Sequence, residues 1–313
     1  MMLTLLAGLL IPAVLPAQPP AVVGRWDLTV VGPRGPYPSW FEISRAGDTL
    51  AGRFQGQFGH ATPIASIVVD GRHFRFVWPN QDNPKAPATV IEGRVIGVDR
   101  IAGAMVPVSG PREGFRGVRA PALARPAPLT WGPAVDLLAA GLAGWRVRDG
   151  KPSGWKMVDG VLTNEGPSAD LISTRRFGDF RLHLEVNLPV NGNSGIYLRG
   201  RYEVQVLDGY PDSPGSRRMG GVYGQVTPTS FPTRPAGAWQ TFDITMVGRR
   251  VTVVLNGVTT IDNVEIPGIT GGALDSEEGA PGPVMLQGDH TAIQYRNIRI
   301  ESAKARPHRP GRA

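Results

Sequence analysis

The stretch NSGIYLRGRYEVQVLD, residues 193–208, decides the fold of the domain that contains it. Apolar and polar residues alternate along it with a period of two, which predicts two β-strands. Gly200 and Arg201 lie between the strands and predict a tight turn. In the second strand, Val204 and Val206 share one face with Tyr202, and we expect that face to enter a core.

The opposite face of this hairpin is polar. If the two valines are buried, Glu203 and Gln205 point together to the other side. The first strand brings Tyr197 and Arg199 to that same side. An aromatic ring, a cation, a carboxylate and an amide on one surface suit a sugar, because the ring stacks on the pyranose and the polar groups bind its hydroxyls. The hairpin therefore predicts a carbohydrate site.

The same hairpin carries a family resemblance. NSGIYLRG followed by YEVQVLD resembles the central signature of the 3-keto-disaccharide hydrolase family, and further segments match in the family's order over roughly residues 129–302. These segments are GWKMVDGVL (154–162), FGDFRLHLEV (177–186), GAWQTFDI (237–244), VLNGV (254–258), GPVMLQGDH (282–290) and YRNIRI (295–300). The family is similar in fold to family 16 glycoside hydrolases and laminin-G-type lectin domains. The resemblance therefore implies a concanavalin A-like β-jelly-roll sandwich.

Strand patterns and turns make the whole chain an all-β protein of two domains. We expect a signal peptide over residues 1–20, a small antiparallel β-barrel (lipocalin-like) or sandwich over 21–119, and an Ala/Pro-rich linker over 120–133. The jelly roll follows over 134–302, and a disordered basic tail over 303–313. Residues 135–145 are the only segment for which we expect helical structure, a turn or two. The first domain is expected to be a structural or spacing unit, or to offer a ligand cavity or an accessory sugar-binding surface.

The composition narrows the possible partners. The 313 residues include 41 glycines and 30 prolines, which favours short strands and turns over long helices. There is no cysteine, so disulfides and thiolate metal sites are excluded. The net charge is +7, but no aromatic residue interleaves with the basic residues of the tail, and no nucleic-acid motif is present. We expect a carbohydrate partner and no nucleic acid, and the oligomeric state stays open.

The chain opens with MMLTLLAGLLIPAVLPAQPP. Its apolar run, residues 3–15, has the length of a signal-peptide core, and the Leu-Pro-Ala that ends at residue 17 suits signal peptidase. The run is short and contains Pro12, so it does not predict a membrane span, and no other transmembrane segment is predicted. We expect export to the periplasm or the extracellular space; the alternative is a buried strand or helix at the N-terminus.

Glu203 and His290 are the candidate catalytic residues. A retaining glycosidase needs two carboxyl groups about 5 Å apart. Family 16 enzymes place Glu-x-Asp-x-Glu on the equivalent strand, whereas this chain has Gln205 after Glu203, which leaves Glu185 as the second carboxylate. The family resemblance implies a different route for a 3-keto sugar. The ketone acidifies the C2 proton, a base removes it, the enolate expels the group at C1, and water then adds. Either Glu203 or His290 is the base.

The candidate substrate-binding residues are Tyr197, Arg199, Gln205, Glu185, His183, Asp208, Gln287 and Tyr223. Tyr210 is a further stacking candidate in the long loop 210–234, and Asp289 is placed to orient His290. Asp289, His290, Glu203 and Asp208 also offer hard ligands for a divalent metal such as calcium. Their spacing is not diagnostic, so a divalent metal stays an open cofactor and no residue is assigned to it.

Three functions fit these residues. The first is an exported enzyme that cleaves 3-keto-glycosides in the groove of the second domain. The second is a carbohydrate-binding module that uses the same groove without turnover. The third is an ordinary family 16-like glycosidase, which is disfavoured because Gln205 stands where a carboxylate is needed. The first two differ in what they require of Glu203 and His290.

Overall fold

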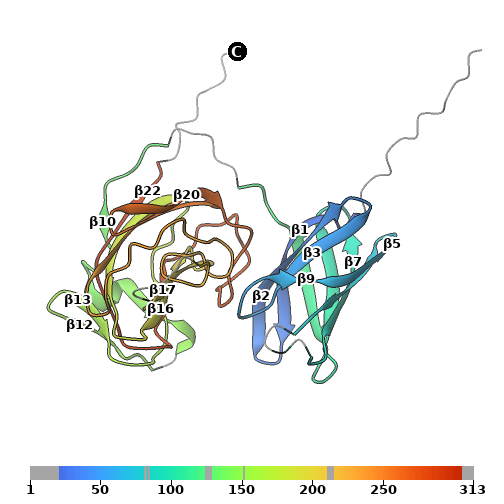
Figure 1. Ribbon diagram of the computed structural model, residues 1–313, viewed down its shortest axis with the longest axis horizontal. Helices are drawn as coiled ribbons and strands as arrows, with labels where there is room; N and C mark the ends of the chain where they lie inside the picture. The colour runs from blue at the N-terminus through green and yellow to red at the C-terminus, as the bar shows by residue number, and fades with distance from the viewer. Residues whose placement is uncertain are drawn as a thin grey trace, which may run out of the picture.

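The computed structural model describes residues 21–80, 83, 85–123, 129–150, 152–209 and 215–304. The expected signal peptide, part of the linker, Tyr210 and all but the first two residues of the expected tail lie outside this set. The described chain forms antiparallel sheets in two bodies that lie side by side (Figure 1), which confirms the all-β prediction. None of the helices in the described ranges has the length and apolar character needed to cross a membrane.

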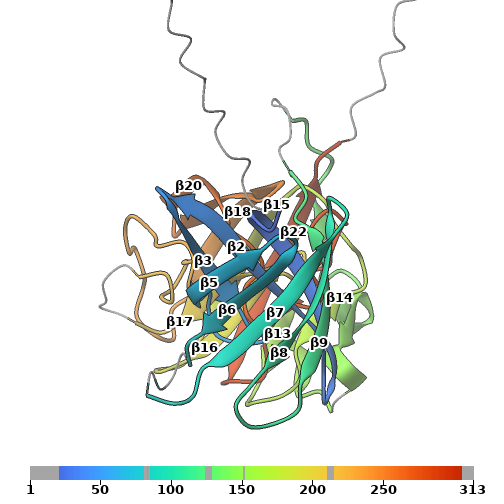
Figure 2. The ribbon, with the colours of Figure 1, turned by 90° about the vertical axis from the view of Figure 1, so that its right-hand side faces the viewer.

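The first body is an antiparallel barrel (Figures 1 and 2). Its strands are β1 (Gly24–Gly32), β2 (Gly35–Ala46), β3 (Thr49–Gln55), β4 (Thr62–Pro63), β5 (Ala65–Asp70), β6 (His73–Trp78), β7 (Thr89–Ile96), β8 (Arg100–Val106) and β9 (Glu113–Arg119). They pair in the order β4-β3-β2-β1-β9-β8-β7-β6-β5. The end strands β4 and β5 are separated in the chain only by Ile64, so the sheet curls until its two ends meet. Of the two predicted forms, barrel or sandwich, the structure has the barrel.

Aromatic rings fill the barrel interior. Trp26, Phe41, Phe54 and Phe76 are fully buried there, and the rings of Phe41 and Phe76 lie 5.3 Å apart. A small barrel packed in this way has a solid core rather than a ligand cavity. Any binding function of this domain must therefore lie on its outside or at its ends.

The second body is a two-layer jelly roll. Its strands are β10 (Val135–Asp136), β11 (Trp145–Val147), β12 (Trp155–Val158), β13 (Val161–Asn164), β14 (Leu171–Ser173), β15 (Phe180–Asn187), β16 (Asn193–Leu198), β17 (Tyr202–Leu207), β18 (Gln240–Val247), β19 (Arg250–Leu255), β20 (Val258–Glu265), β21 (Met285–Leu286) and β22 (Ile293–Ser302). One sheet has the order β12-β13-β22-β15-β18-β19-β20, with β10 beside β22, and the other has the order β11-β14-β21-β16-β17. Within residues 135–145, where a helical turn is predicted, the structure has the short 3-10 helix η1 (Gly141–Gly144). A second 3-10 helix, η2 (Arg148–Gly150), lies beyond that range.

The core between the two sheets sets the direction of the key side chains. Val204 and Val206 of β17 are fully buried in it, together with Leu184 and Val186 of β15 on the facing sheet. Because strand residues alternate between faces, burying the valines turns the intervening residues of β17 to the outer face of the five-stranded sheet. This is the parity that the hydrophobic pattern predicts.

The barrel and the jelly roll share a packed interface. Trp40 of β2 joins the core of the jelly roll, and its Nε1 donates a hydrogen bond of 2.8 Å to the carbonyl oxygen of Ile269. Gly268 lies against the indole so closely that a Cβ there would be 2.6 Å from it. Arg25 of β1 forms a buried ion pair with Glu278 in the loop after β20. The loop after β20 therefore lies between the two bodies, as Figure 1 shows.

Candidate functional site

A polar pocket opens on the outer face of the five-stranded sheet. Glu203 and Gln205 of β17 and Tyr197 of β16 form part of its lining, with Gln287 and His290 after β21. The hairpin register places Tyr197 opposite Glu203, so the two side chains stand next to each other across the strands. The pocket thus gathers both candidate catalytic residues and several of the predicted binding residues.

Glu203 is a buried carboxyl group. It is only 5% exposed, and burial raises its pKa to about 8. The hydroxyl of Tyr197 lies 3.0 Å from Oε2 of Glu203, and Gly195 leaves the space that its side chain occupies. With a pKa near 8, Glu203 is mostly protonated at neutral pH. A neutral carboxyl group in a pocket is suited to donate a proton.

His290 is held by its sequence neighbour. Its Nδ1 lies 2.5 Å from Oδ1 of Asp289, and this hydrogen bond raises the pKa of the imidazole. The same bond lowers the pKa of Asp289. Both side chains line the pocket and are partly exposed at its rim. Because Asp289 occupies Nδ1, Nε2 is the nitrogen left to exchange a proton with a bound molecule.

Gln205 presents an unused acceptor to the pocket. Its Nε2 donates a hydrogen bond of 3.0 Å to Oδ1 of Asn193, while its Oε1 is buried without a partner. The residue is 4% exposed and lines the pocket beside Glu203. A buried carbonyl oxygen without a donor is costly, so a ligand hydroxyl that donates to Oε1 would be favoured.

Arg148 and Asp170 are site residues that sequence reasoning missed. Nη1 of Arg148 donates to Oδ2 of Asp170 at 3.1 Å and to the carbonyl oxygen of Gly272 at 3.0 Å. Oδ1 of Asp170 accepts from the amide of Gly288 at 3.0 Å, and burial raises the pKa of this carboxyl. They reach the pocket from η2 and from just before β14, far from the signature hairpin, and no motif in the chain marks them.

Arg199 points away from the pocket, contrary to the prediction. Strand β16 ends at Leu198, and Arg199 has a φ of 54°, which breaks the alternation on which the prediction rested. Its side chain is buried toward the domain interface, where Nη2 donates a hydrogen bond of 2.5 Å to the carbonyl oxygen of Gly248. Arg148 supplies the cation of the pocket instead.

His183 and Glu185 do not join the site either. Both belong to β15, which pairs with β18 and β22 in the other sheet. His183 bonds Asp243 at 2.7 Å, and Glu185 accepts a hydrogen bond of 2.8 Å from Nε of Arg296. The prediction recognised a polar strand face but had no means of assigning the strand to a sheet. Glu185 is therefore not the partner carboxylate of Glu203.

The remaining predicted residues divide between pocket and loop. Tyr197, Gln287 and Tyr223 line the pocket. Asp208 lies outside its lining, and its Oδ2 accepts a hydrogen bond of 2.8 Å from the amide of Asn191, so it caps a loop. In the described part of the chain, no group of three or more His, Asp or Glu side chains is placed to hold a metal ion. The predicted four-ligand grouping therefore does not form, because Asp208 is elsewhere.

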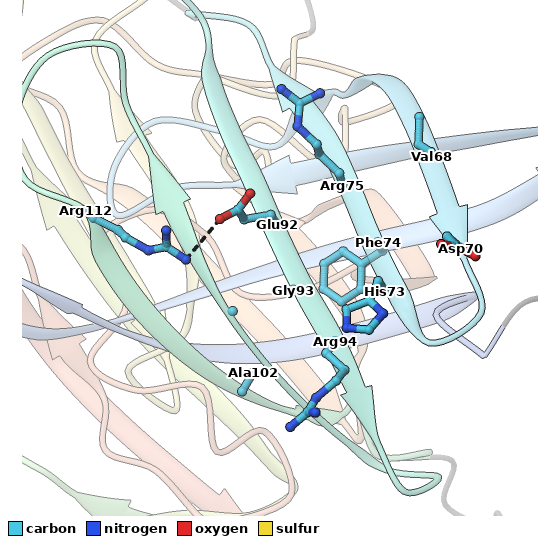
Figure 3. Close-up of a pocket in the computed structure, with 11 residues that line it drawn as sticks. Val68, Asp70, His73, Phe74, Arg75, Glu92, Gly93, Arg94, Ala102 and Arg112 are labelled. Atoms are coloured by element: carbon cyan, nitrogen blue, oxygen red, sulfur yellow. Dashed lines mark ion pairs between the residues drawn. The ribbon is translucent and has the colours of Figure 1, made fainter.

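A second hollow lies on the outer face of the barrel (Figure 3). Residues of β5 to β8 line it, and Arg112 pairs with Glu92 at 3.0 Å across it. Phe74 is the one buried residue of this lining. The hollow shares no residue with the pocket at Glu203 and contains no buried acid. The polar pocket is therefore the candidate active site.

The fold and the pocket define the class of the protein: a two-layer β-jelly-roll with an acid-containing pocket on the outer face of one sheet. Residues 133–301 match the model of the 3-keto-alpha-glucoside-1,2-lyase-like domain. The match spans more than half of the chain, and the chain belongs to this family. This confirms the resemblance that the signature segments indicate.

Three solved structures are similar to parts of this chain. A proposed glycosyl hydrolase from Parabacteroides distasonis is 30% identical, with a TM-score of 0.47, over 57% of this chain and 92% of that one. The carbohydrate-binding module CBM66 from Bacillus subtilis is 14% identical, with a TM-score of 0.33, over 51% and 96%. SCLam, a non-specific endo-beta-1,3(4)-glucanase of family GH16, is 10% identical, with a TM-score of 0.37, over 58% and 94%. A comparison with curated protein sequences gives no match.

Proposed function

We propose that this protein cleaves 3-keto-glycosides by elimination across C1 and C2 followed by hydration. The observation that carries the proposal is a buried carboxyl group, Glu203, facing the same pocket as the His290–Asp289 pair. The protonated Glu203 is suited to donate a proton, and the neutral form of His290 is suited to accept one through Nε2. The family description, a 1,2-lyase-like domain for 3-keto-glucosides, supports the same chemistry.

The raised pKa of Glu203 assigns it the donation of a proton, which leaves removal of the C2 proton to the neutral form of His290. His290, through Nε2, removes the proton from C2, which the neighbouring ketone acidifies. Arg148 is the cation of the pocket and stabilises the negative charge that develops on the ketone oxygen. Glu203 gives its proton to the oxygen that leaves C1, so the C1–O bond breaks as the C1–C2 double bond forms. Water then adds at C1, and C2 regains a proton.

Gln205 orients the sugar and Tyr197 positions the acid, and neither reacts. The unpaired Oε1 of Gln205 accepts a hydrogen bond from a ring hydroxyl. Tyr197 is buried beside Glu203, with its hydroxyl also 3.0 Å from the carbonyl oxygen of Gly271, so it fixes the position of the acid. Tyr223 lines the pocket from the long loop after β17 and offers a ring to the sugar.

The test offers a 3-keto-glucoside and its unoxidised parent to the purified protein. The proposal expects release of the leaving group from the oxidised sugar only, because the parent sugar has no ketone to acidify C2. Cleavage of both at similar rates would instead indicate an ordinary glycosidase. Such an enzyme needs a second carboxyl group free to act, whereas Asp170 in this pocket is bonded to Arg148 and to the amide of Gly288.

A carbohydrate-binding module without turnover is the second candidate. The unpaired acceptor on Gln205 favours it as much as it favours the enzyme, since either function needs a bound sugar. Binding of the oxidised sugar without release of a product would decide for the module.

We also propose export to the periplasm or the extracellular space, on the apolar N-terminal sequence. Detection of the mature chain outside the cytoplasm, lacking residues 1–17, tests that proposal.

A further inference from the structure

The candidate active site is not built by the jelly roll alone. Phe58 and Gly59, in the loop between β3 and β4 of the barrel, line the same pocket as Glu203 and His290. Phe58 is 60% exposed, and it is the only aromatic among the exposed large hydrophobic residues of the described chain. An apolar ring left open to solvent beside a polar pocket is a common sign of a binding surface.

The loop that carries Phe58 is fixed in place. Nε2 of Gln55 donates to the carbonyl oxygens of Gly56 and Phe58 at 3.1 and 3.2 Å. The carbonyl oxygen of Gln57 accepts a hydrogen bond of 2.9 Å from the amide of Gly272 in the jelly roll. These contacts hold the loop from both domains.

The anchor on the jelly-roll side belongs to the active site itself. The carbonyl oxygens of Gly271 and Gly272 accept hydrogen bonds from Tyr197 and Arg148, respectively. Gly271 also packs on the barrel loop, where a Cβ would lie 2.5 Å from the carbonyl oxygen of Gly59. The same short segment therefore positions the acid's neighbour, the pocket cation and the barrel loop relative to one another.

A further pocket, distinct from the hollow on the outer face of the barrel, extends from Phe58 across the end of the barrel. It shares Phe58 and Gly59 with the active-site pocket and is also lined by Tyr37, Trp78 and Met105. Trp78 is held by a hydrogen bond of 2.8 Å from its Nε1 to Oγ1 of Thr62 and by contact of its ring with Phe54 at 4.7 Å. Phe58 therefore stands between the pocket that holds Glu203 and His290 and a pocket lined in part by the rings of Tyr37 and Trp78.

We infer that the barrel end is the leaving-group subsite of the enzyme. The inference rests on the proposed function. The 3-keto ring lies in the polar pocket, its C1 oxygen is directed toward Phe58, and the departing group stacks on Phe58 and reaches toward Trp78. The occupant is a ring with an apolar face, since aromatic side chains bind such rings by stacking. A second pyranose and an aromatic ring both have this chemistry.

The experiment compares wild type, Phe58→Ala and Phe58→Trp on three oxidised substrates. Methyl 3-keto-glucoside has a small leaving group, 3-keto-trehalose a sugar, and 4-nitrophenyl 3-keto-glucoside an aromatic ring. Phe58→Ala is expected to lower kcat/KM by about three- to tenfold on one or both ring-bearing substrates, the size of a lost stacking contact. The methyl glycoside should change less than about twofold, and Phe58→Trp should restore the loss. Whichever ring-bearing substrate responds identifies the source of the ring.

Val98→Ala is the matched control. Val98 is 82% exposed in the turn between β7 and β8 and lines neither pocket. It should leave all three substrates unchanged. An equal loss on the methyl and ring-bearing substrates, or no loss on any, would overturn the inference.

Calorimetric binding of the same three sugars separates this inference from the proposed function. If wild type binds the oxidised sugars but cleaves none, the proposed function is wrong. In that case, weaker binding of the ring-bearing sugars alone by Phe58→Ala supports the subsite, and any other result contradicts it. If wild type cleaves and Phe58→Ala shows no selectivity between leaving groups, the subsite is wrong and the proposed function stands. If wild type neither binds nor cleaves, both are wrong.

Discussion

The hydroxyl oxygen of Tyr197 lies 3.0 Å from Oε2 of Glu203 and 3.0 Å from the carbonyl oxygen of Gly271. A tyrosine hydroxyl has one proton, so it cannot donate to both oxygens at once. The arrangement is fully satisfied when Glu203 is protonated and donates to Tyr197, which then donates to Gly271. Geometry and the raised pKa of Glu203 therefore agree that this acid is neutral at rest.

Replacing this acid with an amide removes the proton donor and keeps the shape. We expect Glu203→Gln to lower kcat on a 3-keto-glucoside by on the order of 10² or more, with little change in binding. Single-turnover kinetics and calorimetry measure the two effects. The matched control is Glu165→Gln, whose carboxylate pairs with Lys156 and is 72% exposed at the surface. Wild-type turnover by the Glu203 variant would remove Glu203 from the mechanism.

The same acid makes the stability of the fold depend on pH. Its pKa in the folded protein is about 8, above the ordinary 4.5, so the folded state holds the proton more tightly than the unfolded chain. The stability that this proton provides is complete below pH 4.5 and is lost as the pH rises toward 8. Glu203→Gln should therefore gain stability over wild type across this range, on the order of 4 kcal/mol at its upper end.

Denaturant unfolding of wild type and Glu203→Gln at pH 5 and pH 8 measures that gain. The difference between the two proteins isolates Glu203, because every other titrating group is common to both. A difference that stays constant from pH 5 to pH 8 would show that Glu203 titrates normally.

The pH dependence of catalysis tests the histidine. His290 acts as base when it is neutral, and Asp289 raises its pKa. Asp289→Asn should therefore move the acidic limb of kcat/KM to lower pH and reduce the plateau, because the imidazole becomes a weaker base. Asp243→Asn is the control, since Asp243 holds His183 at 2.7 Å in the same way on the other sheet. An unshifted limb in Asp289→Asn would assign the base elsewhere.

A methyl group beside the acid tests whether its position matters. A Cβ on Gly195 would lie 2.5 Å from Oε1 of Glu203. Gly195→Ala should displace the carboxyl group and lower kcat by at least about tenfold, because small displacements of reacting groups are costly. Gly166→Ala, at a site with open space around it, should leave kcat unchanged. Unchanged kinetics of Gly195→Ala would show that the acid tolerates movement.

The interface between the domains is expected to be needed for folding stability. Arg25 pairs with Glu278, whose side chain is fully buried. Arg25→Ala leaves that carboxylate without its nearest cation and should lower the free energy of unfolding by about 3 kcal/mol. Arg100→Ala, which removes an exposed pair with Asp99, should cost less than about 1 kcal/mol. Equal, small effects in denaturant unfolding would mean that the interface pair is not structural.

The alternating pattern of β17 was enough to predict the outward direction of Glu203 and Gln205, because parity is a local property of a strand. The predicted direction of Arg199 was wrong for a local reason: the strand ends before it, and its positive φ breaks the alternation in a way that the hydrophobic pattern does not reveal. The predicted placement of His183 and Glu185 in the site was wrong for a non-local reason. A polar strand face has the same sequence pattern in either sheet, so the pattern does not tell which sheet the strand joins. Arg148, Asp170 and Phe58 were beyond prediction, because three separate loops bring them together in space.

The central claim is that the reaction proceeds through removal of the proton at C2, and proton NMR of the reaction in D2O tests it most directly. The account predicts that 3-keto-glucose released from a 3-keto-glucoside carries deuterium at C2, at a rate set by enzyme turnover, and that Glu203→Gln and His290→Asn slow its appearance. Released sugar that keeps its C2 proton throughout would contradict the account.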